Sequence, residues 1–524
     1  MKVRLNPLLI ALYLSGCIAV PAFADTTSNT VQHTDQSNAV QIVKHSSQEE
    51  STVAHTPQIR HQRKKANPQT SVQQRIAFLQ KKEAAHEKSG TVVTQHDLYS
   101  PFDPDAPGKA LVTTGPYVGV PIQYMGSELI INSPSVNTDV QLLDLRKSIM
   151  HQLADYQIDS SDFKHTHLLF SGVVEGEVNY TDVGGGSNTS DIDVTNVSLD
   201  AFFMGPSDWT LGFIEFTYDN GLTGLTSNNS TATNNYRSYA SRVFINKAFI
   251  TLGDFNVSPY YATLGQYYVP FGVYSSLLVT DVVTKLLART KERAITLGIQ
   301  QQDEHNAFYT AIYGYKGETR LPNQVNNGGL NVGYRINRDS YQVDVGAGVI
   351  TNLADSGGMQ LGTNFASYET ITHRVPAYDV HGSVSFFNHY NLLGEYVTAS
   401  TRFNPNDMTY NNRGAKPTAL DTQLAYSFYI LGDRPSSVGI GYARTTQALA
   451  LDLPTNRYSV VFNTSLWRNT LQSLELRHDV NYAASDTANG PVGAQSPVGT
   501  CVAAACVGSG QPNNAITFLF DYYF

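Results

Sequence analysis

Apolar and polar residues alternate along short segments of the chain from residue 165 to the C-terminus. In the first segment the apolar residues are Leu168, Phe170, Val174, Val178 and Tyr180, and the polar ones are His167, Ser171, Glu175, Glu177 and Asn179. A period of two residues places the two sets on opposite faces of a β-strand. The pattern therefore predicts a strand with one apolar and one polar face.

Segments of this kind recur to the end of the chain, each about 10 residues long and bounded by connections rich in Asn, Gly and Asp. We find about sixteen, centred near residues 173, 198, 213, 244, 263, 297, 311, 333, 346, 382, 397, 424, 440, 461, 475 and 519. Long polar connections, such as 352–375 and 484–513, alternate with tight ones, such as 388–390. Residues 165–524 are therefore predicted to form an all-β transmembrane barrel of about 16 antiparallel strands.

The last segment keeps its apolar residues on one face up to the carboxyl terminus. They are Ile516, Phe518, Phe520, Tyr522 and Phe524. A soluble protein would not usually leave so many large apolar groups on one face of its final strand. The segment resembles the C-terminal signal that outer-membrane barrels present to the barrel assembly machinery, with Phe520, Tyr522 and Phe524 as its aromatic residues.

The first 24 residues have the three parts of a secretory signal peptide. Lys2 and Arg4 precede an apolar run, and the stretch ends in Ala22-Phe23-Ala24, a small-x-small cleavage site. The segment ending at Cys17 also fits the pattern at which bacterial lipoproteins are cut and acylated. Cleavage after Ala24 is favoured because the apolar stretch continues past Cys17.

Residues 25–164 do not show the strand period. Residues 25–70 are rich in Ser, Thr, Gln and His, which predicts a disordered tail. Ser71 and Gln74 have the spacing of a capping box, so residues 71–90 are predicted to form a short coiled-coil-like helix, which is either a small oligomerisation helix or a marginal helix without a partner.

Residues 91–164 combine a Pro- and Gly-rich stretch with a second predicted helix. Asn137 is its predicted cap, and its apolar face carries Leu142, Leu145, Ile149 and Leu153. One apolar face needs a partner to cover it. The helix is therefore expected either to pack beneath or inside the barrel or to act as a gating plug, as part of an N-terminal periplasmic or plug-like helical extension.

Composition excludes several other classes of protein. Charged residues make up 15% of the chain, against about 25% in an average soluble domain. The mean hydropathy is −0.23, and no run of about 18 apolar residues follows Asp25, which excludes a helical membrane protein. The mature chain has no basic patch of the size that nucleic acid requires.

The sequence predicts neither an enzyme nor a metal or cofactor site. No Ser, His and Asp lie in a recognisable catalytic setting, and neither His165 with His167 nor any other pair has metal spacing with a third ligand nearby. Cys501 and Cys506, in one loop of an exported protein, are predicted to form a disulfide. Zinc is the weaker alternative because two cysteines supply too few ligands.

A charged segment connects two predicted strands at residues 273–293. Its charged residues are Asp281, Lys285, Arg289, Lys291, Glu292 and Arg293. Charged side chains are costly against lipid, so they are expected in the lumen or at a rim. If the segment folds into the barrel, Lys285, Arg289, Lys291, Glu292 and Arg293 line the pore and favour anionic solutes; the alternative is an extracellular loop. The neighbouring Tyr267 and Tyr268 are predicted to be girdle aromatics at the membrane interface.

Three stretches resemble the LbtU-type siderophore porins, outer-membrane proteins associated with TonB-independent uptake of a legiobactin-like siderophore. They are residues 126–137, residues 265–272 with their Pro-Phe-Gly ending, and residues 280–284 followed by 289–293. The Pro-Phe-Gly ending is shared with phosphate-selective porins. Lys285 departs from the pattern, which has an acidic or neutral residue there.

The resemblance implies an outer-membrane, porin-like transporter for a ferric siderophore or another small anionic solute. The alternative is a less selective anion or phosphate porin. An energised TonB-dependent receptor is disfavoured because the chain after residue 165 is too short for about 22 strands with their loops. The expected partners are outer-membrane lipid, the barrel assembly machinery and the solute, and both a monomer and a homo-oligomer are compatible with the sequence.

Overall fold

The computed structural model describes residues 136–523 apart from a set of gaps, namely 156–166, 185, 187, 205, 206, 208, 220–241, 304, 318, 320–323, 339, 361–370, 372, 388, 432, 433, 468, 469, 490–500, 503 and 504. The predicted signal peptide, tail and first helix lie outside the described residues. So do Cys17 and Phe524.

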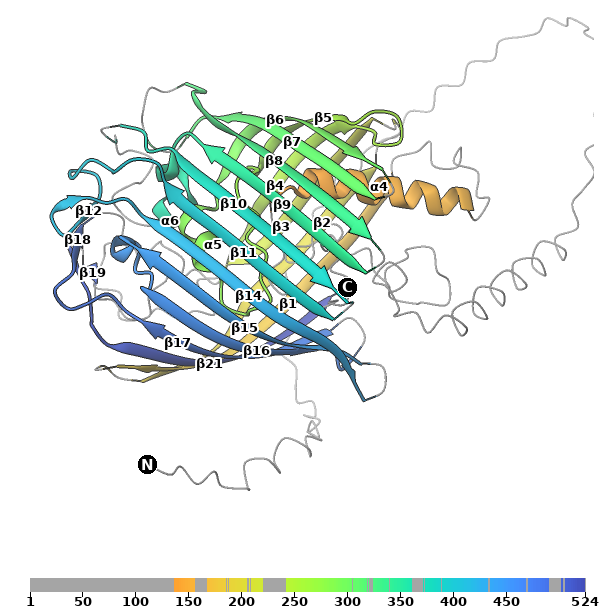
Figure 1. Cartoon of the computed structure of the whole chain (residues 1–524). Coiled ribbons are helices and arrows are strands. Elements are labelled where there is room, and N and C mark those ends of the chain that lie inside the picture. The colour runs from red at the N-terminus through yellow and green to blue at the C-terminus, as the bar shows by residue number, and fades with distance from the viewer. Residues whose placement is uncertain are drawn as a thin grey trace, which may run out of the picture. The chain divides into compact units, whose positions relative to one another are not determined.

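The described chain forms a closed antiparallel barrel of 16 strands (Figure 1). The strands are β1 (His167–Val183), β2 (Thr189–Met204), β3 (Thr210–Asp219), β4 (Arg242–Gly253), β5 (Tyr260–Tyr268), β6 (Lys291–Gln302), β7 (Asn306–Tyr315), β8 (Asn327–Arg338), β9 (Tyr341–Ile350), β10 (Ala377–Phe386), β11 (Tyr390–Ala399), β14 (Thr418–Ile430), β15 (Arg434–Thr446), β16 (Asn456–Thr464), β17 (Thr470–Val480) and β21 (Pro512–Tyr523). Each predicted centre lies within one of these strands, so the predicted fold class is confirmed. The sheet closes where β21 pairs with β1.

The outer face of the barrel is apolar. In β6, Ile295 and Leu297 are 48% and 50% exposed, while Thr296 between them is buried. The final strand repeats this, because Ile516 and Tyr522 are exposed and alternate with buried residues. A closed sheet satisfies its backbone hydrogen bonds internally and leaves no edge, so such a surface can face lipid. The protein is therefore a barrel of the bacterial outer membrane.

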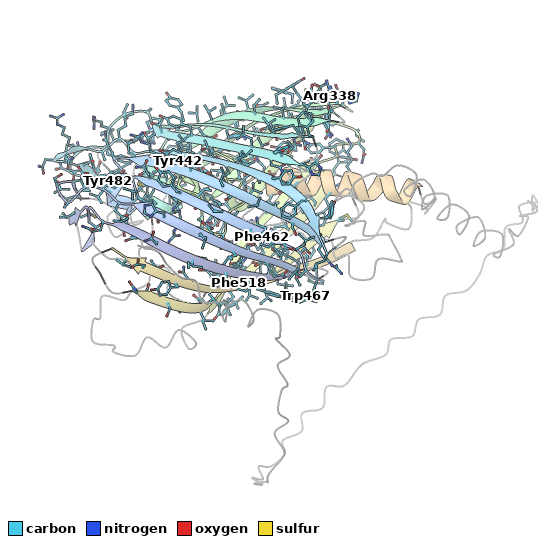
Figure 2. The ribbon with its side chains drawn as sticks, turned by 60° about the horizontal axis from the view of Figure 1, so that its bottom comes forward. Arg338, Tyr442, Phe462, Trp467, Tyr482 and Phe518 are labelled. Atoms are coloured by element: carbon cyan, nitrogen blue, oxygen red, sulfur yellow. The ribbon has the colours of Figure 1, made fainter. Side chains whose placement is uncertain are left out.

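Aromatic side chains gather toward both ends of this apolar surface. At the end with short turns, the rings of Phe386 and Tyr390 stack at 5.2 Å, and Trp467 lies 6.3 Å from Phe520. Toward the other end, Tyr442 and Tyr458 lie 5.3 Å apart. Figure 2 shows Tyr442, Phe462 and Phe518 along the barrel and Trp467 at one end; Tyr482, at the other end, is buried beneath the loops and is not part of the outer surface. This is the arrangement of interfacial aromatic belts.

The connections at the end near Tyr482 are long and form a small sheet of their own. Its strands, in spatial order, are β13 (Arg413–Gly414), β12 (Thr409–Tyr410), β18 (Thr487–Asn489), β20 (Ala505–Val507) and β19 (Cys501–Val502). Long loops mark the extracellular end of an outer-membrane barrel and tight turns the periplasmic end. The small sheet is therefore extracellular.

The described helices are α4 (Thr138–Asp155), α5 (Val283–Ala288) and α6 (Gly357–Gln360), with short 3-10 turns η3 (Leu353–Asp355) and η4 (Leu449–Leu451). Among the described residues no helix has the length and apolar character needed to cross a membrane. Two of these helices, α4 and α5, contact the inner wall of the barrel.

Candidate pore constriction

The chain between β5 and β6, residues 269–290, lies inside the barrel (Figure 1). We call residues 269–290 the inward segment. Its apolar residues Phe271, Tyr274 and Leu277 are 0%, 2% and 1% exposed, so they are covered by the barrel and not by water. The segment includes the short helix α5.

The turn that directs the inward segment into the lumen is at residues 270–272. Pro270 has no N–H to continue the strand ladder, and Gly272 has a φ of 75°, in the left-handed region. A Cβ on Gly272 would lie 2.4 Å from a ring carbon of Tyr274. The Pro-Phe-Gly sequence therefore suits a chain that leaves β5 and folds back sharply.

Side chains of the barrel wall hold the first half of the inward segment. The carboxylate of Glu395, on β11, accepts hydrogen bonds from the Val273 N–H at 2.7 Å and from the Thr284 hydroxyl at 2.8 Å. Gln423, on β14, accepts one from the Leu277 N–H at 2.8 Å. Charge-assisted bonds to a buried carboxylate are among the stronger ones in proteins, so these contacts fix the segment against β11 and β14.

The wall holds the segment further across the lumen as well. Asn463, on β16, donates to the Leu277 carbonyl at 3.0 Å. On β17, Glu475 accepts from the Thr280 N–H at 2.7 Å, and Arg477 donates to the Thr280 hydroxyl at 2.9 Å. The inward segment therefore leaves β5, reaches β17 and returns to β6, which narrows the lumen.

Lys285, the first of the predicted pore-lining residues, lies on α5 within this segment. Its ammonium pairs with the Asp281 carboxylate at 2.6 Å. Burial lowers the pKa of Lys285, and Asp281 opposes this shift. Burial would raise the pKa of Asp281, but Lys285 and Arg289 outweigh it and the pKa is lowered. The pair is therefore an ionic one that presents both signs of charge.

Arg289, Lys291 and Glu292 lie where the inward segment returns to the wall. The Arg289 guanidinium lies 4.4 Å from the centre of the Tyr268 ring, a cation–π contact. The Lys291 ammonium donates to the Asn246 side-chain carbonyl at 2.9 Å. Glu292 is 4% exposed. Lys291 is the first residue of β6, and its ammonium reaches the inner side there, because Asn246 also donates to the buried Glu215 carboxylate at 2.6 Å.

The prediction that Arg293 lines the pore is wrong. Arg293 is exposed and lies between Glu292 and Ala294, which are buried on the inner face. Strand alternation therefore places Arg293 on the outer face with Ile295 and Leu297. Its position near the end of β6 puts its charge toward the interface and away from the lipid centre.

The prediction that Tyr267 and Tyr268 are girdle aromatics is also wrong. Tyr267 is 3% exposed, its hydroxyl is 2.7 Å from that of Thr296, and its ring packs edge-on against Phe249. The Tyr268 ring lies 5.9 Å from the ammonium of Lys247, which is itself fully buried. Both tyrosines therefore belong to the interior packing that supports the inward segment.

The wall formed by β1 and β2, which lies on the other side of β21 from β17, is more accessible to water. On β1 and β2, the inward residues Glu175, Glu177 and Asp193 are only partly buried, whereas Asp421 and Gln423, beneath the inward segment, are 4% and 2% exposed. Glu175 is close enough to Lys285 and Asp281 for electrostatic interaction, and Glu177 to Arg477. The accessible part of the lumen thus has an acidic wall on β1 and β2 and basic groups from α5 and β17.

Helix α4, the first described element of the chain, contacts the inner wall of the barrel. Its anchors are the hydrogen bonds of Asp139 with Thr263 (2.6 Å), of Asp144 with Gln300 (2.8 Å) and of Thr138 with Lys247 (3.5 Å), and the ion pair of Arg146 with Asp254 (3.8 Å). Just before the helix, Val136 forms a backbone bridge with Tyr268. Helix α4 therefore occupies part of the lumen next to the inward segment.

The buried face of α4 differs in part from the predicted one. Leu142 and Leu143 are 0% and 2% exposed, while Leu145 is only partly buried. The side chains of Ile149 and Leu153 lie outside the described residues. Leu143 takes part because it packs against Gly253, where the β4 wall has no side chain.

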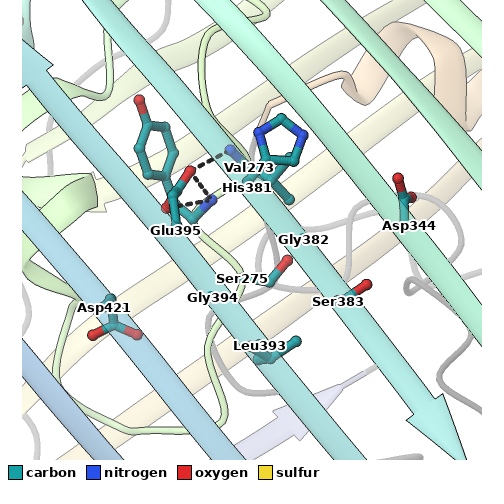
Figure 3. A pocket seen from close by; sticks show the side chains of 11 residues that line it. Val273, Ser275, Asp344, His381, Gly382, Ser383, Leu393, Gly394, Glu395 and Asp421 are labelled. Carbon is teal, nitrogen blue, oxygen red and sulfur yellow. Dashed lines mark hydrogen bonds between the residues drawn. The ribbon is translucent and has the colours of Figure 1, made fainter.

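Further along the wall, the inward segment borders a small pocket between β9, β10, β11 and β14. Figure 3 shows His381 and Glu395 on adjacent strands, with Asp421 and Asp344 to either side. Sequence reasoning did not single out Glu395, Gln423, Glu475 or Arg477. Each of these residues has a carboxylate, amide or guanidinium on the polar face of its strand. That position in the alternation was the signal in the sequence that could have identified them.

Comparison with known proteins gives the family of the chain. A UPF0422 protein of Coxiella burnetii is 37% identical over 417 residues, which cover 79% of this chain and 84% of that protein. The chain belongs to the UPF0422 family. Another UPF0422 protein, from Legionella pneumophila strain Lens, is 34% identical over 429 residues, covering 79% and 76% of the two chains.

No protein-family model matches this UPF0422 protein. Among solved structures, it is similar to an anion-selective porin from Comamonas acidovorans, with a TM-score of 0.43, 11% identity and coverage of 69% and 100% of the two chains. The outer-membrane channel DcaP of Acinetobacter baumannii has a TM-score of 0.42, 10% identity and coverage of 69% and 98%. The barrel assignment of the UPF0422 protein rests on its own strand pairing.

Proposed function

We propose that this UPF0422 protein is a passive outer-membrane channel for a ferric siderophore and that uptake through it does not require TonB. The inward segment carries the proposal, because it narrows the lumen and is held across it by hydrogen bonds from β11, β14, β16 and β17. A fixed constriction with charged groups selects solutes by size and charge. Lys285, Arg289, Lys291 and Glu292 are the proposed lining residues within the segment and at its return.

The charges along the open part of the lumen suit a polar solute that carries carboxylates and hydrogen-bond donors together. Lys285 and Arg477 attract carboxylates, while Glu175 and Glu177 on the nearby strand β1 accept hydrogen bonds. A ferric complex of a carboxylate siderophore has this combination. The resemblance of three stretches to LbtU-type siderophore porins supports the same solute.

Strand number supports passage without energy input from TonB. The barrel has 16 strands, whereas outer-membrane transporters with a plugged lumen use about 22. The competing proposal is a less selective anion or phosphate porin, and the basic residues Lys285, Arg289 and Arg477 favour it. The acidic side chains of Glu175, Glu177 and Asp193 on the open wall oppose it, because they repel simple anions.

Flux through the purified protein separates the two proposals. The mature chain is reconstituted into liposomes, and entry of ferric citrate, inorganic phosphate and a neutral sugar of similar size to ferric citrate is measured. We expect ferric citrate to enter about tenfold faster than phosphate, which corresponds to about 1.4 kcal/mol of preference. Equal rates for both anions would support the less selective porin instead.

Expression gives a second, independent measurement. A channel for ferric siderophores is expected to increase in amount when iron is scarce, and quantitative immunoblotting of outer membranes from iron-replete and iron-starved cells reads this directly. An unchanged amount of protein, together with unselective flux, would overturn the siderophore proposal and leave the barrel and its membrane location intact.

A further inference from the structure

Three buried residues with metal-binding side chains meet on the inner wall where β10 and β11 pair. They are Asp379 and His381 of β10 and Glu395 of β11, with exposures of 1%, 7% and 8%. His381 faces Glu395 directly in the strand register, and Asp379 is two residues away on the same face. One ligand atom from each lies within 4.8 Å of the other two.

The charges of this cluster are not balanced by cationic side chains. Among the described ion pairs, neither Asp379 nor Glu395 has a Lys or Arg partner, and Asp379 is paired only with His381. The Asp379 Oδ1 atom lies 2.5 Å from His381 Nδ1. Two ionised carboxylates beside one imidazole in a buried site would carry an excess of negative charge, which is costly without a compensating cation.

One oxygen of the cluster lacks a partner. Asp379 Oδ2 is buried and accepts no hydrogen bond from the described residues. A buried polar atom without a partner costs about 1–3 kcal/mol, and more when the group is charged. This oxygen therefore points to a ligand that the carboxylate can bind, and a cation also corrects the charge excess.

We propose that Asp379, His381 and Glu395 bind a divalent transition-metal ion in the lumen wall. An imidazole nitrogen with two carboxylates is a donor set that suits zinc and its neighbours, whereas calcium requires 6–8 oxygen ligands. Ligands at about 2.1 Å from zinc lie roughly 3.4 Å apart, so rotations of these side chains suffice to bring the three atoms together. A water molecule would supply a further ligand to a metal held by these three residues.

The surrounding wall leaves room for the imidazole in this position. Gly346 of β9 faces His381 in the register, and a Cβ there would lie 2.3 Å from His381 Nε2. The hydroxyl of Tyr309 lies 3.5 Å from the same nitrogen and also donates to Asp344. The absence of a side chain at residue 346 therefore leaves the space that the His381 ring occupies.

The metal site is connected to the constriction through Glu395. This carboxylate accepts the bonds from Val273 and Thr284 that hold the inward segment. A metal that shares its oxygens competes with these bonds. Metal binding is therefore expected to change the conductance of the channel in addition to occupying the site.

Metal titration of the purified full mature chain tests the proposal. The protein is stripped with a chelator in detergent, then titrated with Zn²⁺ by calorimetry and with Co²⁺ by visible absorption, which reports nitrogen and oxygen coordination. We expect about one Zn²⁺ per chain and Co²⁺ bands that Zn²⁺ abolishes. Asp379→Asn and His381→Asn should each weaken binding at least tenfold, as loss of metal-site residues does.

Two further variants keep the test interpretable. His478→Asn on β17 is the matched control, because His478 is a barrel-wall histidine that contacts Asn514 and lies outside the cluster. Gly346→Ala keeps all three ligand residues, but its methyl group would displace the His381 ring. This variant should therefore also weaken metal binding. Heat-dependent gel mobility verifies that each variant is a folded barrel.

Specific results would overturn the site. The first is that the wild type binds Zn²⁺ no more tightly than folded Asp379→Asn does. The second is that His478→Asn loses as much Zn²⁺ binding as the cluster variants, which would indicate adventitious surface ions. The site does not depend on the solute proposed above. If the metal site is disproved, the proposal of a siderophore channel is unaffected. If the channel proposal is disproved, the proposal of the metal site is unaffected.

Discussion

Lys247 and Glu215 form an ion pair of 2.8 Å inside the barrel, with side-chain exposures of only 1% and 4%. The pair joins β3 to β4, and the Lys247 ammonium is also 3.5 Å from the Thr138 hydroxyl at the start of α4. Its distance to the centres of the Phe213 and Tyr268 rings is 5.9 Å in both cases. One buried cation thus contacts the wall, the N-terminal helix and the base of the inward segment.

Replacement of Lys247 by Met should destabilise the barrel, because it leaves the Glu215 carboxylate buried without its cation. The expected cost is about 3–5 kcal/mol. Urea unfolding of the protein in lipid vesicles, followed by tryptophan fluorescence, measures it. The double variant Lys247→Met with Glu215→Leu should recover most of the loss, and failure of that recovery would show that Lys247 acts by packing instead of charge.

Neutralising Lys285 and Arg289 together as Gln should shift the ion selectivity of the reconstituted channel toward cations. Each fixed charge in a narrow passage contributes to the potential that a solute meets. The reversal potential under a salt gradient measures the shift, which should weaken in 1 M salt, where the Debye length is about 3 Å. Arg293→Gln is the control, since Arg293 lies on the outer face. An equal shift in the control would contradict this placement of the charges.

Weakening the anchors of α4 should open the lumen. Asp139→Ala with Asp144→Ala removes the bonds to Thr263 and Gln300, and a helix about 10 Å wide then no longer stays in place. Single-channel conductance should rise at least about twofold, in proportion to the cleared cross-section. Lys147→Ala, on the same helix, should leave conductance unchanged. If both variants conduct like the wild type, α4 does not limit flow.

Deletion of Phe524 should reduce assembly in the outer membrane about tenfold while β21 keeps its pairing with β1 and β17. The proposed reason is loss of the terminal aromatic of the assembly signal, together with Phe520 and Tyr522. Immunoblots of outer-membrane fractions measure assembly, and refolding of the purified variant in detergent gives the control. Normal membrane levels would remove Phe524 from the signal.

The predicted bridge between Cys501 and Cys506 should stiffen an extracellular loop without supporting the barrel. Cys506 is disulfide-bonded, and the β19–β20 register places Cys501 opposite it. A bridge across so short a ring stabilises the fold little. Cys501→Ser with Cys506→Ser should leave the temperature at which gel mobility shifts within about 3 °C of the wild type. A larger decrease would mean that the loop holds the strands together.

The strands were predictable because each inner or outer position repeats every second residue. Phe518 and Ile516 lie outside and Thr517 inside, as their alternation indicates. The alternation of β5 ends at Tyr268, but periodicity contains no information on the direction of the chain after Gly272. That direction depends on Glu395 and Gln423, which are far along the sequence and come close only when the barrel closes.

The candidate metal cluster was missed for a related reason. Sequence spacing identifies ligands that lie on one turn or one strand, whereas His381 and Glu395 meet through the pairing of two strands. Arg293 shows the opposite error, because its proximity in sequence to Lys291 and Glu292 suggested a shared role. Within a strand, neighbours in sequence face opposite sides, so Glu292 points inward and Arg293 outward.

The small extracellular sheet joins two loops by strand pairing, so that they hold each other in place. Thr409 and Tyr410 of the loop after β11 pair with Asn489 and Ala488 of the loop after β17, and the Asn411 N–H donates to the Thr487 carbonyl at 2.8 Å. If an external protease cut the chain near residue 406, the part after the cut would therefore keep its position, because β12 stays paired with β18. The cut ends would stay attached, one by the strand pairing and the other by the barrel wall, so the outer surface of the protein tolerates a break that would disable an isolated loop.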